Sequence, residues 1–222
     1  MSDSVVAKPM IILGIHTAAP ACDLAIWRDG EIVADVREPM VRGQDARLPD
    51  LTKSLLTTAG CAFSDISRYA VVTGPGSFTG IRVGVAFARG LSLATGAPCL
   101  GVTSLEAALP AGQQGSAIVA LAAQRRPPDI TFWAQTFRSG MATGAATEMR
   151  EDELKQLMSD RPHMLFGDQA ALSRSFPNDT IRPAEPSAAR AAAVAAGLDP
   201  NQRPARPTYA RSPDAALPAN KR

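Results

Sequence analysis

The stretch that decides the fold reads Val71-Val72-Thr73-Gly74-Pro75-Gly76-Ser77-Phe78-Thr79-Gly80-Ile81-Arg82. A β-branched run stops at a Gly-Pro-Gly turn, and a hydroxyl-rich segment then opens a helical pattern that ends near residue 95. A strand, a glycine turn and a helix N-terminus bring backbone N–H groups close to an anion or to another backbone. The stretch therefore predicts one of these two uses.

One face of the predicted helix has almost no side-chain bulk. Positions 80, 84, 88, 92 and 96 hold Gly, Gly, Ala, Ser and Gly, and residues four apart share a helix face. Glycine in a helix interior destabilises the helix by roughly 0.5–1 kcal/mol relative to alanine. Close backbone approach at these positions must therefore stabilise the structure by more than this amount. We interpret this ridge as a packing surface first and as an anion site second. In the alternative, the ridge docks onto the chain's own sheet and Ile81, Val85 and Leu91 face outward.

The turn also suggests a weaker, anion-binding use. It lacks the lysine and the spacing of a Walker A loop, but a helix N-terminus attracts anions. Ser77 or Thr79 is expected to cap the helix. The candidate anion or nucleotide contacts are Gly76, Ser77, Thr79 and Arg82.

Composition is that of an ordinary globular protein, with 45% hydrophobic and 20% charged residues among 222. A net charge of +2 does not by itself argue for nucleic-acid binding. The three cysteines, Cys22, Cys61 and Cys99, are expected to be reduced thiols of a cytoplasmic protein. Neither a signal peptide nor a membrane-spanning run is visible.

The sequence offers little material for catalysis. Its two histidines, His16 and His163, form no metal-binding pair, so we expect no metal site and no cofactor. We interpret His16 as a hydrogen-bonded residue at a strand end. Ser77 lacks the G-x-S-x-G context of a nucleophile elbow. We therefore predict no catalytic residue.

Periodicity and turn residues organise residues 10–95 as β-β-β-α-β-α, the order of the ribonuclease H-like fold. The expected elements are strands Met10–Ile15, Asp23–Arg28 and Glu31–Val36, a polar loop Arg42–Arg47, helix Asp50–Ala59, strand Tyr69–Thr73 and a helix to Thr95. Farther on we expect a helix capped by Ser104, strands Ala117–Ala123 and Ile130–Phe137 around an Arg125–Pro128 turn, helix Glu151–Met158, strand His163–Phe166 and helix Ser187–Ala196.

We expect four parts along the chain. They are a disordered N-terminus (1–9), a first lobe that serves dimerisation (10–103), a second, smaller lobe (104–200) and a basic, proline-rich tail (201–222). The tail carries five basic residues against Asp214, and we expect it to be solvated and partly disordered.

Four segments occur in the order found in one protein family: Ile12–Thr17, Gly74–Arg82, Ser104–Ala107 and Pro207–Arg211. On these segments the chain resembles the TsaB family, also called YeaZ. The resemblance implies an α/β fold of two ribonuclease H-like lobes of the actin-like ATPase superfamily, with a degenerate second lobe. It also implies a non-catalytic dimerisation and activating subunit for TsaD, the paralogue that carries a metal and transfers threonylcarbamoyl to adenosine in tRNA.

The resemblance further implies the partners and the interface. A small ATPase, TsaE, joins the complex, tRNA is met only through it, and a homodimer is possible in principle. The first-lobe helices form the subunit contact in this family. The candidate interface residues are therefore Leu51, Leu55, Phe78, Gly80, Ile81, Gly84, Val85, Ala88 and Ser92.

Two departures from the family pattern bear on function. His16 stands where relatives usually have Asp, which weakens an independent nucleotide site. Ala122–Arg126 lacks the acidic residue that often opens the second lobe. The alternatives left open are an actin-like ATPase or kinase that uses the Gly74–Gly80 turn, a peptidase, and a self-sufficient homodimer.

Overall fold

The computed structural model describes residues 8–124, 130–160, 163–177 and 180–208. The first of its two sheets has the strand order β3-β2-β1-β4-β5. Strands β1, β2 and β3 are antiparallel, whereas β4 and β5 run parallel to β1. The strands are β1 (Ile11–His16), β2 (Ala21–Arg28), β3 (Glu31–Pro39), β4 (Arg68–Val72) and β5 (Cys99–Val102).

The second sheet repeats this plan in the order β11-β10-β6-β7-β8, with β9 also paired to β7. Its hairpin strands are again antiparallel, and β10 and β11 run parallel to β6. The strands are β6 (Ser116–Gln124), β7 (Thr131–Arg138), β8 (Met141–Ala142), β9 (Thr147–Arg150), β10 (Met164–Gly167) and β11 (Ile181–Pro183). The repeated order confirms an α/β fold of two ribonuclease H-like lobes.

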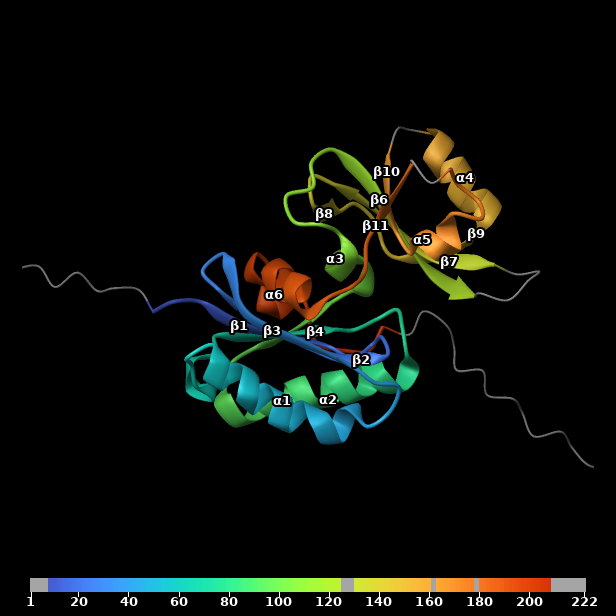
Figure 1. The fold of residues 1–222 in the computed structure, drawn as a ribbon. Helices are drawn as coiled ribbons and strands as arrows, with labels where there is room; N and C mark the ends of the chain where they lie inside the picture. Colours follow the sequence, from blue (N-terminus) through green and yellow to red (C-terminus); the bar gives the residue numbers. More distant parts are fainter. Residues whose placement is uncertain (1–7, 125–129, 161–162, 178–179, 209–222) are drawn as a thin grey trace, which may run out of the picture.

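Helices cover the outer face of each sheet (Figure 1). In the first lobe, α1 (Gln44–Thr58) and α2 (Phe78–Thr95) pack side by side beneath the sheet. In the second lobe, α4 (Glu151–Asp160) packs on β7 and β9, and the short α5 (Gln169–Leu172) contacts β11. Two single 3-10 turns complete the described elements: η1 (Phe63–Asp65) and η3 (Pro200–Gln202).

The two lobes exchange their last helices. Helix α3 (Ser104–Ala108) follows the first sheet but packs on β6 and β7, whereas α6 (Ala188–Ala196) follows the second sheet and packs on β1, β2 and β4. Figure 1 shows α6 lying over the first sheet, on the face opposite α1 and α2. Gly14 of β1 permits this close approach, since a Cβ there would collide with the carbonyl of Ala188.

Helix α6 and residues 203–208 therefore belong structurally with the first lobe, which corrects the predicted division at 104–200 and 201–222. The N–H of Gly101 donates to Arg203 O at 2.9 Å, and the N–H of Thr208 donates to Thr73 O at 2.9 Å. The C-terminal segment thus covers the edge strand β5, and its first part is not a free tail. Residues 209–222 lie outside the described residues.

The predicted disordered N-terminus (1–9) is described by the structure only at Lys8 and Pro9. Lys8 donates a 3.3 Å hydrogen bond to the carbonyl of Ser64, which places it against the first lobe. Residues 1–7 lie outside the described residues, as does the predicted Arg125–Pro128 turn.

Helix α1 begins at Gln44, six residues before the predicted start at Asp50, so the predicted loop Arg42–Arg47 is mostly helical. Leu48 is fully buried in line with Leu51 and Leu55, which extends the apolar face by a turn. Pro49 lies within the helix with an exposed ring. Its missing N–H costs one helical hydrogen bond, which burial of the extended face offsets.

Two helix starts test the capping predictions. Ser77 is confirmed as the N-cap of α2, and its side chain accepts from the N–H of Gly80. The prediction for α3 was one residue off, because Thr103 caps that helix. Glu106 makes a reciprocal bond to the N–H of Thr103, so the two form a capping box.

Candidate functional site

The glycine turn before α2 packs against the turn that joins β1 to β2. The N–H of Ser77 donates to Ala18 O at 2.7 Å. A Cβ on Gly76 would lie 2.6 Å from the same carbonyl oxygen. Of the two uses predicted for this stretch, close backbone approach is the one observed. Gly76, Ser77, Thr79 and Arg82 are exposed at its rim, and their anion contact stays a prediction.

The small-residue ridge of α2 faces the chain's own sheet. A Cβ on Gly80 would collide with the carbonyl of Thr17, and one on Gly84 would collide with the Thr17 side chain. Ala88 is fully buried on the same side. The interpretation of this ridge as a surface for a second polypeptide is therefore wrong, because the end of β1 already occupies it.

Most of the other candidate interface residues are also internal. Their side chains are buried in the core between the first sheet and its two outer helices, as seen for Leu51, Leu55, Ile81 and Val85. The outward-facing alternative for Ile81 and Val85 is wrong for the same reason. Close packing within the lobe, and not contact with a partner, explains why these positions are apolar.

Two candidate interface residues do reach the surface. Phe78 is 42% exposed at the start of α2, with the guanidinium of Arg82 3.7 Å from its ring centroid. Ser92 is half-buried, and its hydroxyl donates to Ala97 O at 2.6 Å near the helix end. Their role in an interface stays a prediction.

The solvent side of α2 carries a second ridge that the sequence reasoning missed. Residues 79, 83, 86, 90 and 93 are spaced by four, three, four and three, which places them on one helix face. We call this face the outer stripe: Thr79, Val83, Ala86, Gly90 and Leu93. Leu93 is 89% exposed, and a Cβ on Gly90 would meet open space. The same spacing was readable in the sequence, but periodicity alone does not say which ridge faces the sheet.

A cleft of about 480 Å³ lies between the two lobes, where an actin-like protein would hold a nucleotide. Its lining residues are Ala18, Ala19, Pro20, Arg37, Leu121, Ala122, Asp168, Ala184, Glu185 and Pro186. Of the charged ones, Arg37 is paired with Glu185 at 3.5 Å, and Asp168 caps α5. Among the lining residues that the structure describes, none is a lysine and none is an unpaired arginine that could hold a phosphate.

Three polar residues stand in a row across the first sheet near this cleft. His16, Asp23 and Arg37 occupy directly opposed positions on β1, β2 and β3. Asp23 accepts from Arg37 at 3.3 Å and from the N–H of Ala188, at the start of α6, at 3.2 Å. Burial raises the pKa of Asp23 to about 6, although both donors favour its charged form.

His16 is 1% exposed, and neither of its ring nitrogens has a hydrogen-bond partner among the described residues. His16 is the last residue of β1, so its predicted place at a strand end is confirmed, whereas the predicted hydrogen bond is wrong. Burial, and to a lesser degree the charge of Arg37, lowers the pKa of His16 to about 4. The imidazole is neutral at pH 7 and cannot supply the negative charge that an acid at this position would offer to a bound cation.

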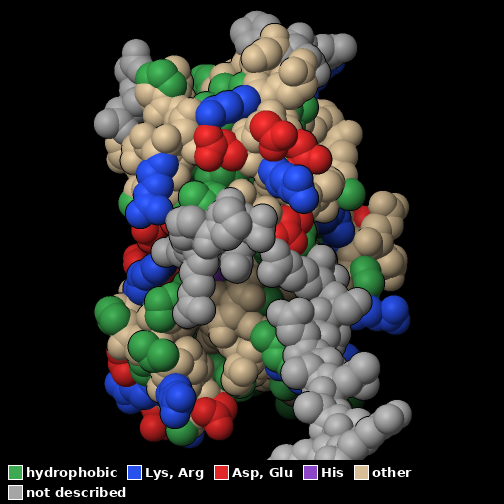
Figure 2. Space-filling view, turned by 90° about the vertical axis from the view of Figure 1, so that its right-hand side faces the viewer, with side chains coloured by type: hydrophobic (Ala, Val, Ile, Leu, Met, Phe, Trp, Pro, Cys, Tyr) green, Lys and Arg blue, Asp and Glu red, His purple; other side chains and the backbone are tan. Residues whose placement is uncertain are grey.

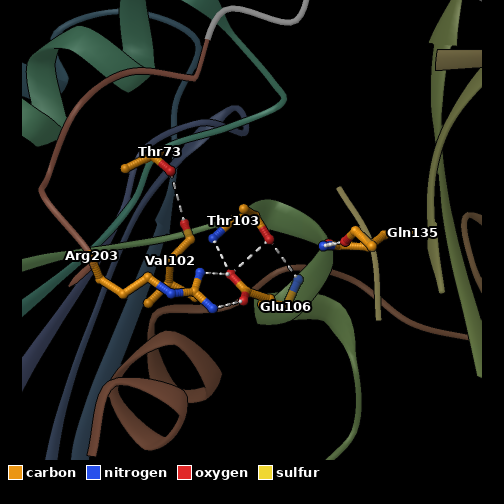
Figure 3. Close-up of polar contacts among 7 residues, drawn as sticks. Thr73, Val102, Thr103, Glu106, Gln135 and Arg203 are labelled. Atoms are coloured by element: carbon orange, nitrogen blue, oxygen red, sulfur yellow. Dashed lines mark hydrogen bonds and ion pairs between the residues drawn. The ribbon is translucent and has the colours of Figure 1, made fainter. Parts of the chain in front are cut away.

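A buried ion pair ties the C-terminal segment to the link between the lobes (Figure 3). Arg203 Nη2 lies 2.9 Å from Glu106 Oε1, and the Glu106 side chain is only 7% exposed. Glu106 also accepts from the N–H and the hydroxyl of Thr103, each at 2.9 Å. The carboxylate is thus satisfied by both the start of α3 and the C-terminal segment.

Among the described residues, no group of three or more His, Cys, Asp and Glu side chains is placed to hold a metal ion. No described helix is both long enough and apolar enough to cross a bilayer.

The repeated sheets and exchanged helices define a two-lobed ribonuclease H-like protein of the actin-like ATPase superfamily. The family model described as TsaD, tRNA N6-adenosine threonylcarbamoyltransferase, matches residues 39–176, which is more than half of the chain. The chain therefore belongs to this family.

Two curated relatives, both named tRNA threonylcarbamoyladenosine biosynthesis protein TsaB, are similar to the chain. The Escherichia coli protein is 37% identical over 142 residues, which is 63% of this chain and 61% of that protein. The Bacillus subtilis protein is 26% identical over 176 residues, 78% of this chain and 77% of that protein. Less than two thirds of the E. coli relative is thus matched.

A solved structure from Pseudomonas aeruginosa, described as an uncharacterized protein with similarity to peptidase YEAZ, shares the fold. Its TM-score is 0.70 at 24% identity, over 91% of this chain and all of that one. At this identity the likeness supports the fold alone.

Proposed function

We propose that the chain is a non-catalytic activating subunit in the synthesis of threonylcarbamoyladenosine in tRNA, and that it binds a TsaD-like catalytic paralogue. Family membership and the TsaB name of the two relatives support this pathway. The observation that carries the mode of action is the outer stripe of α2. A large contiguous apolar patch exposed on a protein marks a site of protein contact.

The outer stripe suits close packing of another helix. Gly90 leaves room for a backbone to approach, and Leu93 offers a large apolar side chain beside it. Phe87, half-buried next to the stripe, adds to the apolar area. Many dispersion contacts of about 0.1–0.2 kcal/mol each sum over such a surface. In Figure 2, hydrophobic side chains reach the surface of the lower, first lobe beside Lys and Arg.

Activation follows from preferential binding. A subunit that binds the competent conformation of its partner more tightly than the other conformation raises the competent population. The chain needs no chemistry of its own for this role. We also propose a TsaE-like ATPase as a further partner, contact with tRNA through the complex, and a cytoplasmic location. A homodimer would use the same stripe and is the competing occupant.

The ATPase or kinase alternative finds no support in the cleft between the lobes. The neutral His16 replaces an acid, and the ion pair to Glu185 engages Arg37. A peptidase would need an activated nucleophile, whereas the hydroxyl of Ser77 is used as a helix cap.

Reconstitution tests the proposal. Purified TsaD-like and TsaE-like subunits from the same organism are incubated with tRNA, ATP and threonylcarbamoyl-adenylate, with or without this chain. Modified adenosine is then measured by mass spectrometry of tRNA nucleosides. We expect the product to require the chain. Equal product in both mixtures would overturn the proposed role.

A matched pair of variants tests the stripe. Ala86→Glu places a charge in the outer stripe, and Ala145→Glu makes the same change at an exposed loop of the second lobe. We expect Ala86→Glu to abolish both the complex in size-exclusion chromatography and the activation, and Ala145→Glu to change neither. A complex that survives Ala86→Glu would show that the contact lies elsewhere.

A further inference from the structure

A groove of about 630 Å³ runs along the C-terminal end of α2 and shares Gly90 and Leu93 with the outer stripe. Arg89, Gly90, Ser92 and Leu93 of α2 form one wall, and Cys99 at the start of β5 forms the floor. The opposite wall is the C-terminal segment. The residues that it contributes are Pro200, Pro204, Ala205 and Arg206.

The charge of this groove has one sign. Arg89 and Arg206 stand on opposite walls, and none of the described lining residues is acidic. Helix α2 contains no Asp or Glu at all. The neighbouring Arg203 is neutralised by Glu106, whereas neither Arg89 nor Arg206 forms an ion pair within the described residues. Two arginines that form no ion pair within the described residues thus line a groove whose other lining residues carry no charge.

Besides the two arginines, the groove offers an apolar surface to a ligand. Leu93 is 89% exposed, and the rings of Pro200 and Pro204 face the same space. The C-terminal segment is held in place, since Pro204 bridges to Leu100 and Gly101 donates to Arg203 O. A preorganised wall lowers the entropic cost of binding.

We propose that the groove binds an acidic segment of a partner protein, in which two carboxylates flank one large apolar side chain. Arg89 and Arg206 would pair with the carboxylates, because guanidinium groups bind carboxylates in a bidentate manner. The apolar side chain would pack against Leu93 and the proline rings. The proposal deepens the proposed function, on which it rests, by giving the chemistry of the contact at the C-terminal end of the outer stripe.

A protein segment fits this groove better than RNA does. Single-stranded RNA is held by aromatic side chains that stack on bases, together with a track of cations along the backbone. The described lining has no aromatic residue and two arginines. The exposed leucine and the prolines favour an aliphatic or aromatic side chain of a protein.

Photo-crosslinking in the assembled complex tests the occupant. Benzoylphenylalanine replaces the exposed Pro204 in the full chain, which is mixed with the TsaD-like and TsaE-like subunits and tRNA, then irradiated. We expect a crosslink to a protein segment with at least two Asp or Glu residues near a large apolar one. A crosslink to tRNA or to a basic segment, or no crosslink while the complex forms, would overturn the proposal.

Charge reversal supplies an independent readout. The double variant Arg89→Glu and Arg206→Glu is compared with Arg174→Glu, which changes an exposed arginine of the second lobe. We expect the double variant to weaken binding of the crosslinked subunit at least tenfold and to reduce its salt dependence, with the melting temperature unchanged. If the double variant binds with wild-type affinity, the proposal for the groove is overturned but the proposed function is not. Failure of the wild-type chain to bind either subunit would overturn the proposed function as well.

Discussion

The hydroxyl of Thr17, just past the end of β1, donates a 2.7 Å hydrogen bond to the carbonyl of Gly80 in α2. This contact joins residues 63 positions apart and leaves no room for a side chain between strand and helix. Gly80 and Gly84 are therefore structural glycines, whose absent Cβ atoms let α2 lie against the first sheet.

Alanine substitution at two glycines of α2 should change the free energy of unfolding in opposite directions. Gly84→Ala would push a methyl group into Thr17, and we expect a loss of about 1–3 kcal/mol in the free energy of unfolding from overpacking. Gly90→Ala, which meets open space, should gain up to about 1 kcal/mol from helix propensity. Urea denaturation followed by circular dichroism measures both. Equal effects would contradict the assignment of the two faces.

The buried His16 should make stability depend on pH. Its folded-state pKa of about 4 lies below the usual 6.5, so the unfolded chain takes up a proton first as pH falls. As pH falls from 6.5 to 4, the free energy of unfolding of wild type should therefore decrease by about 3 kcal/mol relative to that of His16→Gln. Urea midpoints of both proteins across this range test the prediction. A constant difference would mean that His16 titrates as in water.

The titration of Asp23 should make stability depend on pH in the opposite direction. Its folded-state pKa of about 6 lies above the usual 3.8, so the folded chain holds the proton more tightly. Relative to Asp23→Asn, wild type should lose about 2 kcal/mol of stability as pH rises from 4 to 6. The same urea series serves as the measurement. A difference that grows with pH would show that Arg37 and Ala188 dominate over burial.

The pair between Arg203 and Glu106 should hold the C-terminal segment on β5. We expect Arg203→Ala to speed hydrogen exchange at the amides of Gly101 and Thr208, because both amides pair the C-terminal segment with the first lobe and that segment loses its anchor. Arg206→Ala removes a neighbouring arginine that makes no contact with Glu106 and is the control. Unchanged exchange in Arg203→Ala would indicate that backbone pairing alone is sufficient.

The order of elements in the first lobe was predictable because turn and cap residues mark the ends of its elements in the sequence. Asp29 and Gly30 both adopt positive φ in the β2–β3 hairpin, and Gly96 ends α2 in the left-handed region, as their residue types require. The start of α1 was not predictable from polarity alone. The buried Leu48 extends the apolar face into a segment whose other residues are mostly polar.

The candidate interface was harder to predict for a physical reason. Periodicity shows that Gly80, Gly84 and Ala88 share a face, but the partner of that face is decided by tertiary packing. Here Thr17, just past the end of β1, packs against this face of the helix. Likewise, nothing local in the sequence indicates that Arg203 would reach Glu106 or that α6 would cross to the first sheet.

The exchange of α3 and α6 has a consequence for synthesis on the ribosome. The inner face of the first sheet stays bare until residues 188–196 have left the exit tunnel, because α6 is the helix that covers it. The first lobe therefore keeps an open apolar surface until α6 has been synthesised. A chain truncated before residue 188 would be a substrate for chaperones and proteases.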